Sequence, residues 1–224
     1  MKRISGYIIS LLAILLVVPV TARNNTDGAE TDLQLELPVE PGLRIGFNLV
    51  RPLMVFPVPS RFGIEGSADY NIGPDYFAVA EAGFSARDLN EPTYHLQERG
   101  MFLRIGADRN LYNHFDDVIG VGGRLGVSIY DRGAPLINVE DGYWGDYSGT
   151  LATNTFFRQW AEVVFVIKAE IFSNFFLGWT LRGKILLFDG GDKHLDDRYI
   201  PGFGAGTSNS AAGFDFYIYY RIPL

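Results

Sequence analysis

The stretch FDFYIYYRIPL, residues 214–224, contains the pattern that decides the fold. Apolar and aromatic residues occupy every second position, and Asp215 and Arg221 occupy two of the positions between them. Side chains on a β-strand point alternately to its two faces, so a period of two gives one apolar and one polar face. The stretch therefore predicts an amphipathic strand.

The same alternation returns in seven further segments, which predicts an all-β fold. Over the six segments where it is clearest, one face carries 13 charged residues and the other carries only Arg109. No apolar stripe with helical spacing continues for more than two turns. The eight predicted strands are residues 43–52, 60–70, 76–87, 100–110, 118–130, 156–169, 175–188 and 211–224.

The N-terminus has the features of a secretory signal peptide. Lys2 and Arg3 precede an apolar run, and small residues follow it up to Ala22. The run has roughly 13 residues, short of the ~20 that span a bilayer as a helix, so we expect cleavage rather than anchoring. The predicted organisation is a signal peptide at 1–22, a polar periplasmic lead-in at 23–42 and one domain at 43–224.

The composition excludes several classes of protein. The 224 residues include no cysteine, which excludes disulfide scaffolds and thiol nucleophiles. A net charge of -7 argues against nucleic acid as a partner. With 47% hydrophobic residues the chain is too apolar to be disordered.

The arrangement of glycines and loops favours an outer-membrane barrel, whose apolar face meets lipid, over a soluble barrel, whose apolar face lines the interior. Expected loops at 88–99, 131–155 and 189–210 are long, and those between them are short, as in outer-membrane barrels. Glycine on the charged face would make room for arginine in a narrow interior. These glycines are Gly46, Gly63, Gly83, Gly106, Gly120, Gly122, Gly126, Gly178 and Gly213.

Aromatic residues near the strand ends are a third feature, because aromatic girdles mark the two membrane interfaces. The residues expected to form girdles are Tyr70, Tyr76, Phe77, Tyr112, Phe115, Tyr130, Phe156, Phe157, Phe175, Phe176, Phe188, Tyr219 and Tyr220.

We expect the charged faces to form a structural ion-pair network inside the barrel, because a buried charge is tolerated only when it is paired. A narrow path favouring anions is the alternative, since ten basic residues face six acidic ones. The predicted network consists of Arg44, Arg61, Glu65, Asp69, Glu81, Arg87, Arg104, Asp108, Arg124, Arg158, Glu162, Lys168, Arg182, Lys184, Asp215 and Arg221.

The last predicted strand resembles the C-terminal signal of outer-membrane proteins, in which alternate apolar residues count back from the final position. The resemblance implies recognition by the barrel-assembly machinery. This sequence ends in Leu224 where phenylalanine is usual, after Pro223. The residues of the signal are Phe214, Phe216, Ile218, Tyr220, Ile222 and Leu224.

Several stretches resemble an uncharacterised family of small outer-membrane β-barrels of Gram-negative anaerobes, within the OmpA- and OmpX-like class. The family has no assigned activity, so the resemblance implies fold and location and supplies no functional residues. The stretches are residues 46–52, 77–83, 143–149, 174–179 and 219–223.

The loops offer three weaker hypotheses. The three long loops contain 11 acidic residues, and Asp189, Asp192 and the pair at 196–197 are candidates for binding a divalent cation, although a solvated acidic surface is preferred. The aromatic stretch 143–147 could bind a glycan or a peptide, or cap the barrel. Histidine and serine near a barrel rim would suit an enzyme acting on lipid; the candidates are His95 or His194 with Ser85, Ser128 or Ser148.

We therefore expect an eight-stranded antiparallel up-and-down transmembrane β-barrel with a polar, side-chain-filled interior and both termini in the periplasm. Its expected role is non-enzymatic, structural or in surface interactions, without a cofactor, in contact with outer-membrane lipids. A lipid-modifying enzyme and a small anion-favouring pore are the alternatives.

Overall fold

The computed structural model describes residues 42–53, 60–112, 117–139, 145–189 and 199–223. The expected signal peptide lies outside these residues, as does the lead-in apart from Gly42. The described elements are β1 (Gly42–Asn48), α2 (Val50–Leu53), β2 (Arg61–Gly73), β3 (Tyr76–Glu91), β4 (Tyr94–Asn110), β5 (Val118–Val139), β6 (Tyr147–Phe172), β7 (Phe175–Asp189) and β8 (Ser210–Pro223).

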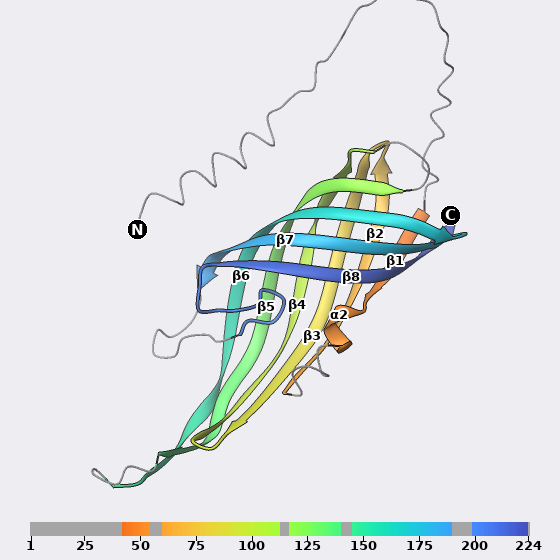
Figure 1. The fold of residues 1–224 in the computed structure, drawn as a ribbon. Coiled ribbons are helices and arrows are strands. Elements are labelled where there is room, and N and C mark those ends of the chain that lie inside the picture. The colour runs from red at the N-terminus through yellow and green to blue at the C-terminus, as the bar shows by residue number, and fades with distance from the viewer. Residues whose placement is uncertain (1–41, 54–59, 113–116, 140–144, 190–198, 224) are drawn as a thin grey trace, which may run out of the picture. The chain divides into compact units, whose positions relative to one another are not determined.

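The eight strands form one antiparallel sheet that closes in a ring (Figure 1). Each strand pairs with its successor, and β8 returns to pair with β1, from Gly42 opposite Pro223 to Asn48 opposite Tyr217. We call the end that holds this closing pair and the β2–β3 and β6–β7 turns the short-turn end, and the opposite end the hairpin end. The prediction of an all-β fold with eight antiparallel strands is confirmed.

Four strands extend beyond their predicted bounds at the hairpin end, which corrects two predicted loops. Residues 88–99 form a hairpin rather than a loop, with β3 pairing to β4 as far as Glu91 opposite Tyr94. Most of 131–155 likewise belongs to β5 and β6. Polar side chains occur on both faces of these extensions, so the sequence does not alternate between apolar and polar residues there. The backbone pairing nevertheless continues.

β1 is shorter than predicted and gives way to a helix. The Oδ1 atom of Asn48 accepts hydrogen bonds from the backbone N–H of Val50 (2.9 Å) and of Arg51 (3.3 Å), which is helix N-capping. Pro52 has no N–H to donate to a strand ladder. Within the described ranges, no helix has the length and apolar character needed to cross a membrane.

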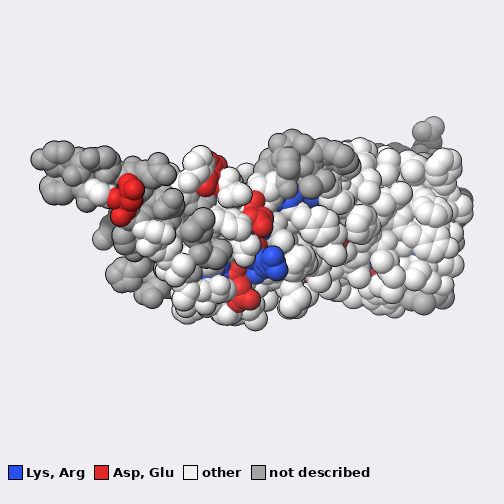
Figure 2. Space-filling model, turned by 90° about the horizontal axis from the view of Figure 1, so that it is seen from below, with Lys and Arg blue, Asp and Glu red and all other residues white. Residues whose placement is uncertain are grey.

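The outer surface of the ring is predominantly apolar, and the charged face of each strand points inward. In Figure 2 charged residues gather towards the hairpin end, and the rest of the visible described surface is uncharged. Among the described residues, 28 large hydrophobic side chains are exposed. Those with the largest exposed fractions include Met101 (67%), Leu187 (61%), Leu125 (59%) and Ile129 (55%).

The aromatic residues divide between the two faces, which corrects part of the predicted girdles. Five of them are buried inside the ring: Phe77, Tyr130, Phe156, Phe176 and Tyr219. Phe115 lies outside the described residues, and Phe157 is half-buried. The exposed members are Tyr70, Tyr76, Tyr112, Phe175, Phe188 and Tyr220.

Several inward-facing glycines make room for aromatic rings rather than for arginine, contrary to the prediction. A Cβ atom on Gly126 would lie 2.2 Å from Cε2 of Trp160, and one on Gly46 would lie 2.3 Å from the ring of Tyr219. Gly122, where the added atom would meet Asp108 and Arg124, is closer to the predicted role. These rings fill much of the interior.

Substituting Gly126→Val should therefore lower the free energy of unfolding by about 1–3 kcal/mol, the usual cost of overpacking a filled interior. Gly123→Val is the matched control, because a Cβ atom there would meet only the carbonyl oxygen of Glu162, at 3.9 Å. Urea unfolding of both variants measures the difference. Equal effects of the two substitutions would contradict the packing assigned to Trp160.

Candidate functional site

The middle of the ring contains a network of ion pairs around two arginines. Arg104 of β4, with an exposed fraction of 0%, donates through Nη2 to Oε1 of Glu65. Its Nε atom lies 2.8 Å from Oε2 of Glu81. The hydroxyl of Tyr217 also donates to Oε1 of Glu65, so this carboxylate joins three strands.

Arg182 of β7 binds three carboxylate groups, one of which is Glu81 from the far side of the ring. Its Nη1 atom lies 3.0 Å from Oε2 of Glu81 and 3.0 Å from Oε2 of Glu162. Its Nε atom lies 2.6 Å from Oδ2 of Asp215. The Nε1–H group of Trp160 donates to Oε1 of Glu162 at 2.6 Å, so an aromatic residue completes the network.

The short helix α2 adds a third arginine to this network. The Nε atom of Arg51 lies 3.0 Å from Oε2 of Glu65 and 3.6 Å from Oδ1 of Asp215. Asn48, the capping residue of α2, donates from Nδ2 to Oδ1 of Asp215 at 2.7 Å. The helix that follows β1 is thereby attached to the network through the side chain of Arg51.

Two smaller groups of ion pairs lie towards the short-turn end. Arg124 binds Asp108 through two parallel hydrogen bonds of 2.7 and 2.9 Å, the bidentate geometry that makes such pairs strong. Asp69 accepts hydrogen bonds from Nε of Arg44 and from Nζ of Lys168, both at 2.6 Å. The guanidinium of Arg44 lies 4.4 Å from the ring centroid of Phe77.

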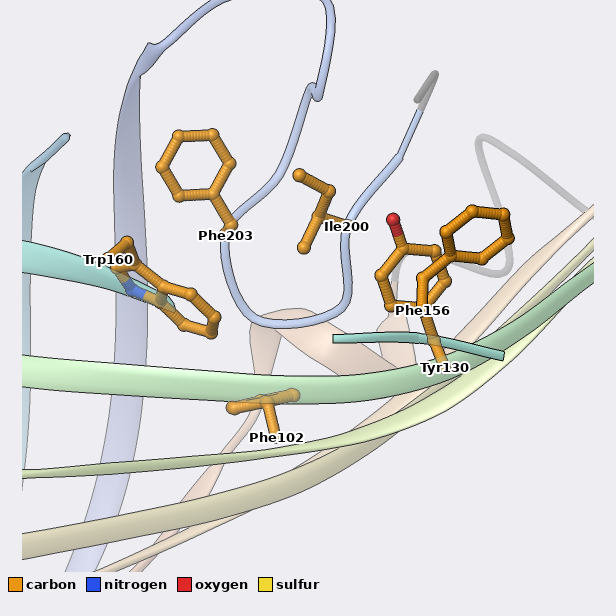
Figure 3. Close-up of a cluster of buried hydrophobic side chains, with 6 residues drawn as sticks. All are labelled: Phe102, Tyr130, Phe156, Trp160, Ile200 and Phe203. Atoms are coloured by element: carbon orange, nitrogen blue, oxygen red, sulfur yellow. The ribbon is translucent and has the colours of Figure 1, made fainter. Parts of the chain in front are cut away.

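A hydrophobic cluster fills the interior on the hairpin side of this network (Figure 3). Ile200 and Phe203 belong to residues 199–204, which precede β8 and lie inside the ring, and they meet side chains of β4, β5 and β6. The Nζ atom of Lys184 donates to the carbonyl oxygens of Gly202 (2.7 Å) and Phe203 (3.1 Å). The cluster consists of Phe102, Tyr130, Phe156, Trp160, Ile200 and Phe203.

The charge balance changes beyond this cluster. Four inward-facing charged residues occupy one row across neighbouring strands: Arg61, Arg87, Glu98 and Arg132. Glu98 lies 3.3 Å from Arg132 and 3.8 Å from Arg87. The central network and the two smaller groups together pair six basic groups with six acidic ones, whereas this row has three basic groups and one acidic one among the described residues.

All sixteen residues of the predicted network lie on inward-facing positions. All are buried except Arg61 and Arg87, which are half-buried. Prediction missed Arg51, assigned to a strand, as well as Glu98 and Arg132, assigned to loops. Extending the two-residue period of side-chain direction past the predicted ends of β4 and β5 would have placed Glu98 on the same face as Arg104, and Arg132 on the same face as Arg124.

The loop hypotheses receive little support from the geometry. The segment 199–204, expected in an exposed acidic loop, is largely buried inside the ring. The stretches 140–144 and 190–198, with His194 and most of the candidate cation ligands, lie outside the described residues; elsewhere in the structure no three His, Asp or Glu side chains are grouped for a metal. His95 pairs with Asp88 at 2.6 Å on the outer face, whereas Ser85 and Ser128 point inward.

Replacing Arg104 by leucine should lower the free energy of unfolding by about 3–5 kcal/mol, because it leaves Glu65 and Glu81 buried with fewer partners. Arg109→Leu is the control, since Arg109 is exposed on the same strand. Urea titration of the two purified variants gives both values. An Arg104→Leu midpoint equal to that of the control would contradict the structural role of the network.

Comparison with known proteins finds one family. The chain matches the family described as a domain of unknown function, DUF6048, over residues 4–224. A search of curated proteins finds no match. The prediction that the chain belongs to an uncharacterised family agrees with this result. Because the match covers nearly the whole sequence, the chain belongs to the DUF6048 family.

Proposed function

We propose that this chain is a transmembrane β-barrel of the Gram-negative outer membrane with a structural or surface-interaction role, and that it is not an enzyme. The observation that carries the proposal is the inverted distribution of side chains. Charged residues such as Arg104 and Arg182 are buried, while 28 large hydrophobic residues are exposed among those described. A soluble ring of strands would place these two classes the other way round.

The closed ring supports the same conclusion through its backbone. In the hydrocarbon of a bilayer every backbone N–H and C=O must find a partner within the protein, so spanning strands form closed barrels. Exposed apolar patches on soluble monomers rarely exceed a few hundred Å². Contact with acyl chains removes the penalty that so large an apolar surface would incur in water.

The proposed orientation places the short-turn end in the periplasm. Outer-membrane barrels have short periplasmic turns and longer extracellular loops, which matches the β6–β7 turn and the long β5–β6 hairpin. Residues 1–22 would then direct export, and the barrel-assembly machinery would recognise β8. The hairpins β3–β4 and β5–β6 would stand outside the cell, available for interactions.

The filled interior favours a structural barrel over the alternative of a pore. The ion-pair network and the cluster of Figure 3 occupy successive levels of the ring, and Arg104, Trp160 and Ile200 are inaccessible to solvent. Planar-bilayer recording tests this choice: steady single-channel steps would favour the pore. The enzyme alternative is tested by lipid A mass spectra from cells with and without the gene, and a difference would favour it.

Membrane insertion is tested directly with Leu125→Arg. Leu125 is 59% exposed on the apolar surface, and arginine facing the middle of a bilayer costs about 2–4 kcal/mol in such barrels. We expect less protein to float with liposomes and less heat-modifiable migration on gels. Asn90→Arg, which adds the same charge on the exposed β3 extension, should behave as wild type. A wild-type protein that is monomeric in water without detergent would contradict the proposal.

A further inference from the structure

In the described part of the chain, no strand continues the wall of the ring beyond the end of β1. β1 pairs with β2 only over Gly66–Tyr70 and with β8 only over Tyr217–Pro223. Towards the hairpin end, β2 and β8 face each other without an intervening strand in the described part of the chain. The helix α2 contacts both strands at the point where β1 stops.

A cavity of about 210 Å³ lies in this interval. Its lining includes Phe62 and Phe214, which are exposed on the apolar outer surface. It also includes Gly63 and Asp215, whose positions face the interior. Residues from both faces of the sheet therefore border one cavity between the two strand edges.

The inner part of the cavity offers hydrogen-bond donors and positive charge. Ser85 lines it, is 2% exposed, and its Oγ atom has no hydrogen-bond partner among the described residues. Arg61 also lines it and has no carboxylate partner among the described residues; its guanidinium lies 4.3 Å from the ring centroid of Tyr199. Arg61 belongs to the row with a surplus of basic groups, so an anion there would balance charge.

The outer part of the cavity is suited to an alkyl chain. Phe62 and Phe214 flank the opening, and Ile64, Met101 and Ile129, in the next outward-facing row towards the short-turn end, continue the apolar surface. The row of Phe62 itself continues through Ala86 to Arg99 and Asp131, which are exposed and charged. The cavity thus lies at the margin of the apolar surface, where head groups of amphiphiles are found.

We propose that this cavity binds the anionic head group of a single-chain amphiphile, a carboxylate or phosphate, which enters from the membrane between β2 and β8. Arg61 supplies the counter-charge and Ser85 a hydrogen bond, and the alkyl chain lies outside against Phe62 and Phe214. Ligand pockets that enclose a whole drug-sized molecule have about 300–1,000 Å³. At about 210 Å³ this cavity holds a head group and the first carbons of a chain. The inference rests on the proposed membrane insertion.

Photolabelling in phosphatidylcholine liposomes tests the site. A fatty acid with a diazirine in its chain is incorporated into liposomes that contain the full chain, and labelled peptides are mapped after irradiation. We expect labels near Phe62 and Phe214, and competition by palmitate but not by methyl palmitate, which has no charge. Competition by methyl palmitate as strong as by palmitate, or labels spread evenly around the ring, would overturn the proposal.

Two variants with matched controls examine the two halves of the site. Arg61→Gln should raise the palmitate concentration for half-competition about tenfold, since hydrogen bonds to charged groups contribute that much to binding. Arg109→Gln, which removes an arginine lying over Tyr76, should leave it unchanged. Gly63→Leu should abolish labelling by filling the cavity, whereas Gly183→Leu, with open space around it, should not.

Separate controls distinguish a lipid head group from a soluble anion, and show whether each variant folds and inserts into the membrane. Competition by inorganic phosphate as effective as by palmitate would assign the site to a soluble anion and overturn the amphiphile proposal. Flotation and heat-modifiable migration are measured for every variant, and Arg61→Gln remains decisive if Gly63→Leu does not fold. Protein that floats but shows no specific label refutes this inference alone, whereas wild-type protein that does not float refutes membrane insertion.

Discussion

The binding of Arg104 and Arg182 to carboxylates from opposite walls is the interaction on which the rest of the structure depends. A charged group removed from water costs several kcal/mol unless partners compensate it. Here six of the eight strands contribute a member to one network, from Glu65 on β2 to Asp215 on β8. The strands are therefore connected across the interior as well as through their backbone ladders.

This network also explains how a ring with an early break in one strand is held together. β1 ends at Asn48, and α2 follows it, in contact with β2 and β8. Arg51 and Asn48 bind the same carboxylates that Arg104 and Arg182 bind, so the replaced segment is attached to the centre. On the short-turn side of the point where β1 ends, these ion pairs connect the neighbouring strands. On the hairpin side, β2 and β8 border the cavity.

Much of the fold could be predicted because the alternation of apolar and charged residues shows directly which residues share a face of each strand. All sixteen inward charges were identified from parity alone, since a residue two positions from Arg104 or Arg182 must share its face. Three features were beyond that argument. The extensions of β3 to β6 have no apolar face, so only backbone pairing defines them. The helix α2 depends on a local cap, and the burial of Ile200 and Phe203 depends on space left by distant glycines.

The candidate site was harder to predict than the network because it arises from an interruption of the pattern. Arg61 has the same parity and residue type as Arg104, yet Arg104 has several carboxylate partners and Arg61 has none among the described residues. The difference is set by which acids lie opposite in three dimensions, and sequence spacing does not contain that information. The cavity itself exists because β1 ends early, a property of Asn48 and Pro52 rather than of its own lining.

The distribution of charge along the ring argues for binding rather than passage. In the central network and the two smaller groups beside it, six acidic groups match six basic ones, and opening a path there would separate several buried ion pairs, at several kcal/mol each. Nearer the hairpin end the basic groups of the described row are in surplus, and no described strand lies between β2 and β8. A molecule in the cavity meets Arg51 and Asp215, and the ion pairs of these residues continue towards the short-turn end. The bound amphiphile that we propose would therefore leave by the side from which it came, because the network lies across any path to the other end.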